Sequence, residues 1–110
     1  MGMEPISREL VEYVTAGEKC PFLDWLNRLR DVQGRAFIRK RLNRVRLGNL
    51  GINRSLGDGV WELKVEFGPG YRVYYGEDGA KIVVLLCGGD KGSQRRDIEE
   101  AKKYWRDYLA

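Results

Sequence analysis

Residues 60–94, VWELKVEFGPGYRVYYGEDGAKIVVLLCGGDKGSQ, predict three β-strands joined by two tight turns. Over residues 61–67 apolar side chains alternate with charged ones, which is typical of a strand with one buried and one open face. Gly68-Pro69-Gly70 and Asp78-Gly79 supply the turns, because glycine adopts positive φ and Asp-Gly favours a hairpin. Residues 81–87 are apolar on both faces, so they predict a central strand covered on both sides.

The alternation places four polar side chains on the open face of the first hairpin. They are Glu62, Lys64, Arg72 and Tyr74. The strand exit, residues 88–91, leads into a helix that begins near Ser93, and the free N–H groups at a helix start favour an anion. A cationic face beside a helix start indicates a phosphate site. The alternative is a set of ordinary solvated strand residues with a structural ion pair, either Glu62 with Arg72 or Lys64 with Glu66.

Composition indicates one domain, residues 1–110, with an anionic partner. The formal net charge is +4 and 43% of the residues are hydrophobic, which is enough for one core. No apolar run approaches the roughly 18 residues of a membrane span, and the start lacks a signal-peptide pattern, so we expect a cytoplasmic protein. The chain has no histidine, and Cys20 and Cys87 are isolated, so we expect no metal, no cofactor and two reduced, structural cysteines.

The remaining elements are expected on either side of this sheet. Residues 1–7 are expected to be frayed, and residues 49–59 predict a glycine-containing loop. A helix begins at Pro21, where the missing N–H costs nothing, and the pattern breaks at residues 31–34. Residues 8–15 predict a strand or a short helix, and their β-branched residues favour the strand. The other expected elements are a helix over residues 35–47 capped by Gly48 and a helix over residues 93–109 with Ser93 as N-cap.

The predicted fold class is therefore α+β, in the order β-α-α-β-β-β-α. A curved, mostly antiparallel sheet carries a helical hairpin on one side, with the final helix beside it. The alternation also predicts which side chains are buried. They are Trp61, Leu63, Val65, Tyr71, Val73, Val84 and Leu86.

The two helices expected over residues 21–47 carry an unbalanced positive charge. Their basic residues are Arg28, Arg30, Arg35, Arg39, Lys40, Arg41, Arg44 and Arg46, whereas the acidic ones are Asp24 and Asp31. Charged helix faces are usually only solvated. Here the imbalance in sign indicates contact with nucleic acid or with an acidic protein.

Three blocks, taken together and in order, resemble a known toxin superfamily. LRDVQGRAFIRKRLNRVRLGNLG, GDGVWELKVEFGPGYRVYY and VVLLCGGDKGSQRRDIEEAKKY closely resemble the RelE/ParE toxins, and within them the HigB-like addiction-module killer proteins. The resemblance covers residues 8–108 and implies a RelE-like fold. It also implies the toxin of a type II toxin–antitoxin pair, an mRNA interferase that enters the ribosomal A site. Such an endoribonuclease lets the 2′-hydroxyl attack the adjacent phosphate, without a metal, and so inhibits translation.

The resemblance implies four catalytic residues by position. Arg72, in G-Y-R, matches the family's phosphate-holding arginine, and Lys64 matches a lysine that serves as base or charge stabiliser. Glu62 stands where relatives have a basic residue, and Lys91 stands where they have a basic residue or a histidine. The chemistry needs cations around the phosphate, a base for the 2′-hydroxyl proton and a donor for the leaving oxygen.

The predicted RNA contacts surround these positions. They are Arg54, Tyr74, Gln94, Arg35, Arg39 and Arg44. Of these, Arg54 lies in the loop that supplies active-site residues in some relatives, and the arginines of residues 35–44 come from the basic helices. The resemblance further implies a cognate antitoxin with a helix-turn-helix DNA-binding fold. We expect an acidic segment of that antitoxin to cover part of the helical hairpin.

The sequence departs from the family in its proton-transfer groups. Many active relatives use a histidine, or a tyrosine near the C-terminal helix, whereas this chain has no histidine and carries Arg96 or Asp97 at about the place of that tyrosine. The general base and acid therefore stay open. Two other functions stay open as well, namely a ParE-like toxin that binds DNA gyrase without cleaving RNA, and an inactive prophage-derived relic.

Overall fold

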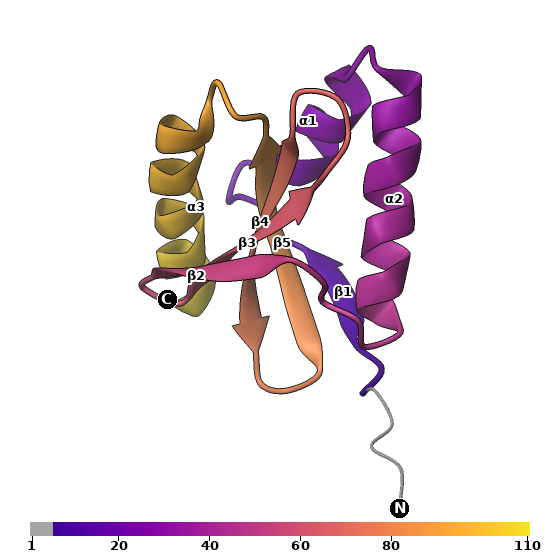
Figure 1. Ribbon diagram of the computed structural model, residues 1–110. Coiled ribbons are helices and arrows are strands. Elements are labelled where there is room, and N and C mark those ends of the chain that lie inside the picture. Colours follow the sequence, from indigo (N-terminus) through magenta and orange to yellow (C-terminus); the bar gives the residue numbers. More distant parts are fainter. Residues whose placement is uncertain (1–5) are drawn as a thin grey trace, which may run out of the picture.

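A computed structural model describes residues 6–110 as one five-stranded curved sheet with helices on both faces (Figure 1). The elements are β1 (Glu9–Glu12), α1 (Pro21–Arg28), α2 (Val32–Arg46), β2 (Asn53–Gly57), β3 (Val60–Val65), β4 (Tyr71–Asp78), β5 (Ile82–Gly89) and α3 (Gln94–Leu109). The strand order is β1-β5-β4-β3-β2, and only the β1–β5 pair is parallel. The predicted α+β class and mostly antiparallel sheet are confirmed.

The first strand and the last helix were both predicted, with different accuracy in their bounds. The strand expected over residues 8–15 is β1, which is shorter than predicted, and the helix expected over residues 93–109 is α3. Residues 1–5, part of the segment expected to be frayed, lie outside the described residues, and residues 6–8 have no regular secondary structure. None of the helices over residues 6–110 is long and apolar enough to cross a membrane.

The expected loop over residues 49–59 is wrong in its centre, where the chain forms β2. This strand pairs antiparallel with β3, and Arg54 lies opposite Glu62. Gly57, Asp58 and Gly59 all have positive φ, so they form the tight turn that reverses the chain between the two strands. The glycines thus make a hairpin, which brings Arg54 onto the sheet beside Glu62.

The predicted break at residues 31–34 is in fact the start of α2. The Asp31 carboxylate accepts a hydrogen bond from the Gly34 N–H at 2.9 Å and another from the Tyr71 hydroxyl at 2.7 Å. The first bond caps the helix and the second ties its start to β4. At the other end Gly48 has φ 94°, and the Asn49 N–H bonds to the Arg44 carbonyl at 2.8 Å, so the predicted glycine cap is confirmed.

The sheet lies between two hydrophobic cores, one on each of its faces. The core beneath α1 and α2 includes Phe22, Leu26, Ile38, Leu42, Leu63, Val65, Tyr71, Val73 and Tyr75. The core beneath α3 includes Tyr13, Val60, Tyr74, Val84, Leu86, Cys87, Ala101 and Trp105. Burial is confirmed for every predicted side chain except Trp61, which is only partly buried at the edge of the first core. The prediction that residues 81–87 form a central strand covered on both sides is also confirmed.

The face of β3 and β4 that was predicted to be open is covered, so that prediction is wrong. The exposed fraction is 0% for Tyr74, 4% for Glu62 and 7% for Arg72. The cover is α3, whose Trp105 ring packs directly on β4 at Gly76. A Cβ atom at that glycine would lie 2.4 Å from the ring, so the absent side chain is what lets the helix approach.

Candidate functional site

A pocket of about 230 Å³ opens where β2, β3 and β4 meet the start of α3. The predicted site residues that line it are Arg54, Glu62, Lys64, Arg72 and Gln94. Strand pairing produces this grouping, because Glu62 lies opposite Arg54 on one side and Tyr74 on the other, and Lys64 lies opposite Arg72. The pocket therefore collects residues from three strands and a helix that are far apart in the sequence.

Glu62 is the centre of the hydrogen bonding in this pocket. Its Oε1 accepts from Arg54 Nε at 2.9 Å, and its Oε2 accepts from Gln94 Nε2 at 2.9 Å. Burial acts to raise the pKa of Glu62, but the hydrogen bonds from Arg54 and Gln94 and the charges of Arg54 and Arg72 outweigh it and hold the pKa below its usual value. Glu62 is therefore an ionised carboxylate at neutral pH, with a positive charge on either side.

Arg72 is held in the pocket wall with part of its bonding capacity unused. Its Nη1 donates to the Gly70 carbonyl at 2.7 Å, whereas its Nε lies 3.7 Å from Glu62 Oε2, beyond hydrogen-bond distance. That Nε is buried and has no hydrogen-bond partner among the described residues, although it is close enough to Glu62 for an ion pair. A buried donor without an acceptor costs about 1–3 kcal/mol of folding free energy. An anion that accepted a hydrogen bond from this Nε would remove that cost.

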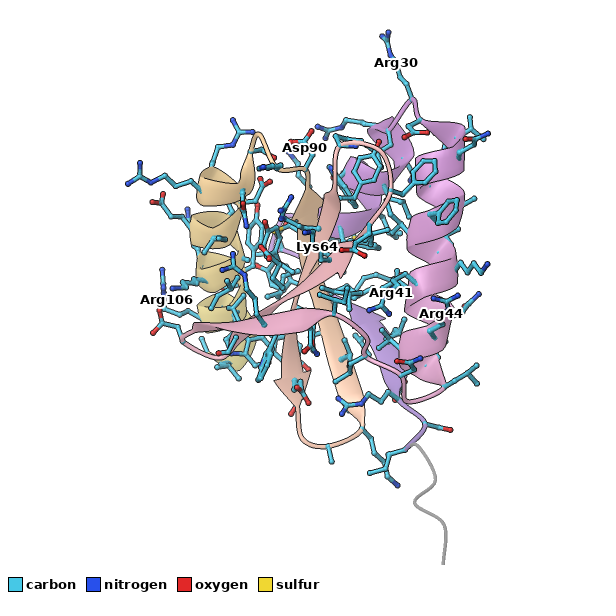
Figure 2. The ribbon with its side chains drawn as sticks, viewed as in Figure 1. Arg30, Arg41, Arg44, Lys64, Asp90 and Arg106 are labelled. Carbon is cyan, nitrogen blue, oxygen red and sulfur yellow. The ribbon has the colours of Figure 1, made fainter. Side chains whose placement is uncertain are left out.

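Lys64 is the remaining cation of the pocket. It is partly buried, and it takes part in none of the ion pairs found over residues 6–110. Figure 2 shows it over the sheet, across from the basic helix α2. With Arg54 and Arg72 it gives the pocket three positive charges against the one carboxylate of Glu62, so the pocket favours anions.

Tyr74 is buried in the core beneath α3 and does not line the pocket. The hydroxyl is buried without a hydrogen-bond partner in the described part of the chain. Burial, together with the negative charges of Glu62 and Asp97, raises the pKa of Tyr74, so the phenol stays neutral. As long as α3 keeps this position, Tyr74 has no surface with which to contact RNA.

The anion site predicted at the start of α3 lies next to a carboxylate of the chain itself. Asp90 Oδ1 accepts from the N–H groups of Gly92 at 2.8 Å and Ser93 at 3.2 Å, which are the two residues just before the helix. A Cβ atom at Gly89 would lie 1.8 Å from Asp97, which shows that this glycine is required by packing. Lys91 is exposed beyond the pocket and does not line it.

The three arginines predicted on the helices lie in three different surroundings. The Arg35 guanidinium donates to the Leu29 carbonyl and so links α2 to the end of α1. Arg39 lines a groove beside β1, whereas Arg44 lines a pocket that faces Lys64. The structure thus brings only Arg44 of the three toward the Glu62 pocket.

Sequence reasoning missed the face of α2 that turns toward this pocket. Phe37, Lys40, Arg41 and Arg44 share it. Their spacing of three, four and seven residues is the signature of one helix face. The sequence contains this signal, which appears once the basic residues of α2 are placed on the helix by their spacing.

The described residues also bear on metals and thiols. Over residues 6–110 there is no group of three or more His, Cys, Asp or Glu side chains placed to hold a metal ion. Cys20 and Cys87 form no disulfide, as predicted. Burial, followed by the charges of Asp97 and Glu100, raises the pKa of the Cys87 thiol, so this cysteine is a packing residue of the α3 core.

This geometry defines a class of protein: a small α+β protein whose sheet carries an arginine-lined pocket that favours anions. The chain matches the family described as Phage derived protein Gp49-like (DUF891) over residues 24–106. An uncharacterized protein of Haemophilus influenzae is 43% identical over 81 residues, which covers 74% of this chain and 82% of that protein. The chain belongs to the Gp49-like family, which is a RelE-like toxin–antitoxin family. The resemblance found in the sequence is confirmed at this level.

Proposed function

We propose that this protein is the HigB-like toxin of a type II pair and a metal-independent, ribosome-dependent mRNA endoribonuclease of the cytoplasm. The observation that carries the proposal is the Glu62 pocket, where Arg54, Lys64 and Arg72 surround one ionised carboxylate and a buried Arg72 N–H has no acceptor. Membership of a RelE-like toxin family supports the same reaction class.

In this proposal the scissile phosphate takes the place that Glu62 now shares with the arginines. Arg72 binds a phosphate oxygen through its unused Nε, and Arg54 and Lys64 stabilise the charge that develops on phosphorus. As the phosphate draws the two arginines away, Glu62 loses part of the positive charge that lowers its pKa. It thereby becomes a stronger base for the 2′-hydroxyl proton.

The bond changes follow from that placement. The 2′-oxygen bonds to phosphorus, the bond to the 5′-oxygen breaks, and the products are a cyclic phosphate and a 5′-hydroxyl end. Glu62 takes the proton from the nucleophile, and the ammonium of Lys64 donates one to the leaving oxygen. This assigns base and acid without histidine, and it leaves Lys91 and Tyr74 outside the reacting group.

Primer extension on mRNA from cells that briefly express the protein tests this function. We expect new 5′ ends within seconds to minutes of induction in the wild type. Replacing Arg72 by Lys should slow cleavage on the order of a hundredfold, because an ammonium cannot reproduce the guanidinium fork. Arg106→Lys, on the outer side of α3 (Figure 2), is the matched control and should cleave normally. Circular dichroism checks that both variants fold.

Two outcomes would overturn the proposal that the protein is a nuclease. Growth arrest with intact transcripts, together with loss of supercoiling by purified gyrase, would identify a ParE-like toxin. Normal growth during unopposed expression would identify an inactive prophage-derived relic. The partner in all active cases is a cognate antitoxin, for which we propose a helix-turn-helix fold and an acidic segment that meets the basic surface of α2.

A further inference from the structure

A second pocket, of about 290 Å³, adjoins the Glu62 pocket on the side of α2. Ile52 and Lys64 line both pockets, so the two lie next to each other. The cations of the second pocket are Lys40, Arg41, Arg44 and Lys64, and its acidic residue is Glu66. Figure 2 shows Arg41 and Arg44 on α2, next to the part of the sheet that carries Lys64. We call this second pocket the α2 pocket.

The cations of the α2 pocket are not paired with Glu66 or with any other carboxylate in residues 6–110. Over residues 6–110, none of Lys40, Arg41, Arg44 and Lys64 forms an ion pair, whereas Arg54 and Arg72 in the first pocket both pair with Glu62. Like charges held together raise the free energy of the empty pocket, and a bound anion removes that cost. The α2 pocket is thus the more strongly unbalanced of the two.

Arg41 is fixed in place within the α2 pocket. Its Nη2 donates to the Leu50 carbonyl at 2.5 Å, and its Nη1 is buried with no partner in the described chain. Gly51 makes room for the guanidinium, since a Cβ atom there would lie 1.8 Å from Nη2. A preorganised guanidinium with a free N–H is a suitable donor for a phosphate oxygen.

An aromatic pair stands at the wall of the same pocket. The rings of Phe37 and Phe67 stack with centroids 4.3 Å apart and an interplanar angle of 15°. Phe37 lines the pocket and is 44% exposed. An exposed ring beside a row of cations is the arrangement with which proteins bind single-stranded nucleic acid, where bases stack on rings and phosphates meet Lys or Arg.

We propose that the α2 pocket binds the nucleotide adjacent to the one held at Arg72, with its phosphate on Arg41 and Arg44 and its base against Phe37. This inference rests on the proposed function, because it takes single-stranded RNA as the ligand of the Glu62 pocket. Lys64 then lies between two consecutive phosphates. An acidic peptide of the antitoxin would satisfy the cations but would leave the exposed ring without a role, so RNA is the ligand that the residues favour.

Binding of an uncleavable RNA tests the electrostatic part. Fluorescence anisotropy with a short 2′-O-methyl RNA, which lacks the attacking hydroxyl, is measured over a range of NaCl. Arg44→Gln should weaken binding about tenfold at low salt and reduce the salt slope by about 0.7, the value for one lost contact to a single strand. Arg106→Gln removes the same charge from the outer side of α3 (Figure 2) and is the matched control, with a change below about twofold expected.

Stacking is tested at Phe37. Phe37→Leu keeps an apolar contact with Phe67 but removes the ring, and it should weaken binding roughly tenfold, whereas Phe37→Tyr should restore it. Quenching of 2-aminopurine placed along the RNA reports stacking directly, and it should fall in Phe37→Leu at one nucleotide position.

Equal losses in Arg44→Gln and Arg106→Gln, or unchanged affinity and quenching in Phe37→Leu, would show that the α2 pocket is no nucleotide site. If Arg44→Gln and Phe37→Leu lost antitoxin binding but kept RNA binding, the α2 pocket would be an antitoxin site, and the proposal would also be overturned. Failure of the nuclease looks different: the wild type would bind the RNA through this pocket but leave cellular mRNA uncut.

Discussion

Glu62 controls the charge of the first pocket, and its behaviour with pH follows from its partners. Arg54 and Gln94 hydrogen-bond to it, and Arg72 lies close by, so folding favours its ionised form and lowers its pKa below the usual 4.5. A carboxylate of this kind contributes stability above its unfolded pKa and loses that contribution as pH falls through the lowered folded value.

We therefore predict that Glu62→Gln destabilises the protein by about 1–3 kcal/mol near pH 7, because it leaves two arginines beside a neutral group. The difference from wild type should shrink as pH falls below about 4.5 and vanish once the wild-type carboxyl is protonated. Urea unfolding at both ends of this range measures it. The control is Glu66→Gln, at an exposed position. A difference that is the same at every pH would mean that shape and not charge matters at Glu62.

Much of this pocket was predictable at the scale of single residues. The alternation over residues 61–67 and the turn at residues 68–70 determine which side chains of β3 and β4 share a face, and these include Glu62, Lys64 and Arg72. The hydrogen bond from Gln94 to Glu62 joins residues 32 positions apart. It depends on where α3 packs, and no local pattern in the sequence specifies that placement.

Among the elements, α3 shows what periodicity can and cannot tell. Its bounds were predicted to within a residue, since Ser93 and the apolar spacing are local signals. The sequence did not predict that α3 covers β3 and β4. The local evidence for this contact is Gly76, a glycine inside a strand. Such a glycine indicates that another element packs closely there but does not show which element it is. For the same reason β2 was missed, since NRSLG lacks apolar alternation and becomes a strand by pairing with β3.

The contact between α3 and β4 yields a prediction. Gly76→Ala would place a methyl group 2.4 Å from the Trp105 ring, so we expect a loss of about 1–3 kcal/mol from overpacking. Gly17→Ala is the control, because the nearest atom to its Cβ is Thr15 Oγ1 at 3.8 Å. Thermal unfolding of both variants measures the loss. If the two variants melt together, the helix is free to shift, and its cover over Tyr74 is looser than the structure indicates.

At the scale of the whole molecule, α2 presents basic side chains in more than one direction. Lys40, Arg41 and Arg44 face the pockets from α2, and Arg39 lies on the other side of the same helix. Arg30 projects away from the body at the α1–α2 turn (Figure 2). Opposite charge on a partner would speed encounter through this field, and dissolved salt would screen it.

For the antitoxin we predict an association rate that falls at least tenfold between about 50 and 500 mM NaCl, as the screening length shortens. Arg44→Glu should slow association at low salt, whereas Arg30→Glu, equally charged but remote, should change it little. Stopped-flow fluorescence gives the rates. Association that is indifferent to salt and to Arg44→Glu would place the affinity in apolar contacts instead.

The hydrogen bonds that join the two ends of the chain also determine when, during synthesis, the fold and its pocket can be completed. Arg8 meets Glu77 across 69 positions and Tyr13 meets Asp107 across 94, so the first strand is made long before its partners exist. Gln94, which completes the Glu62 pocket, is also among the last residues synthesised. Pairing at such separation forms late. In the proposed function, an unfinished copy lacks the complete pocket and does not cleave RNA. Pulse proteolysis of stalled nascent chains should show protection only once α3 has emerged.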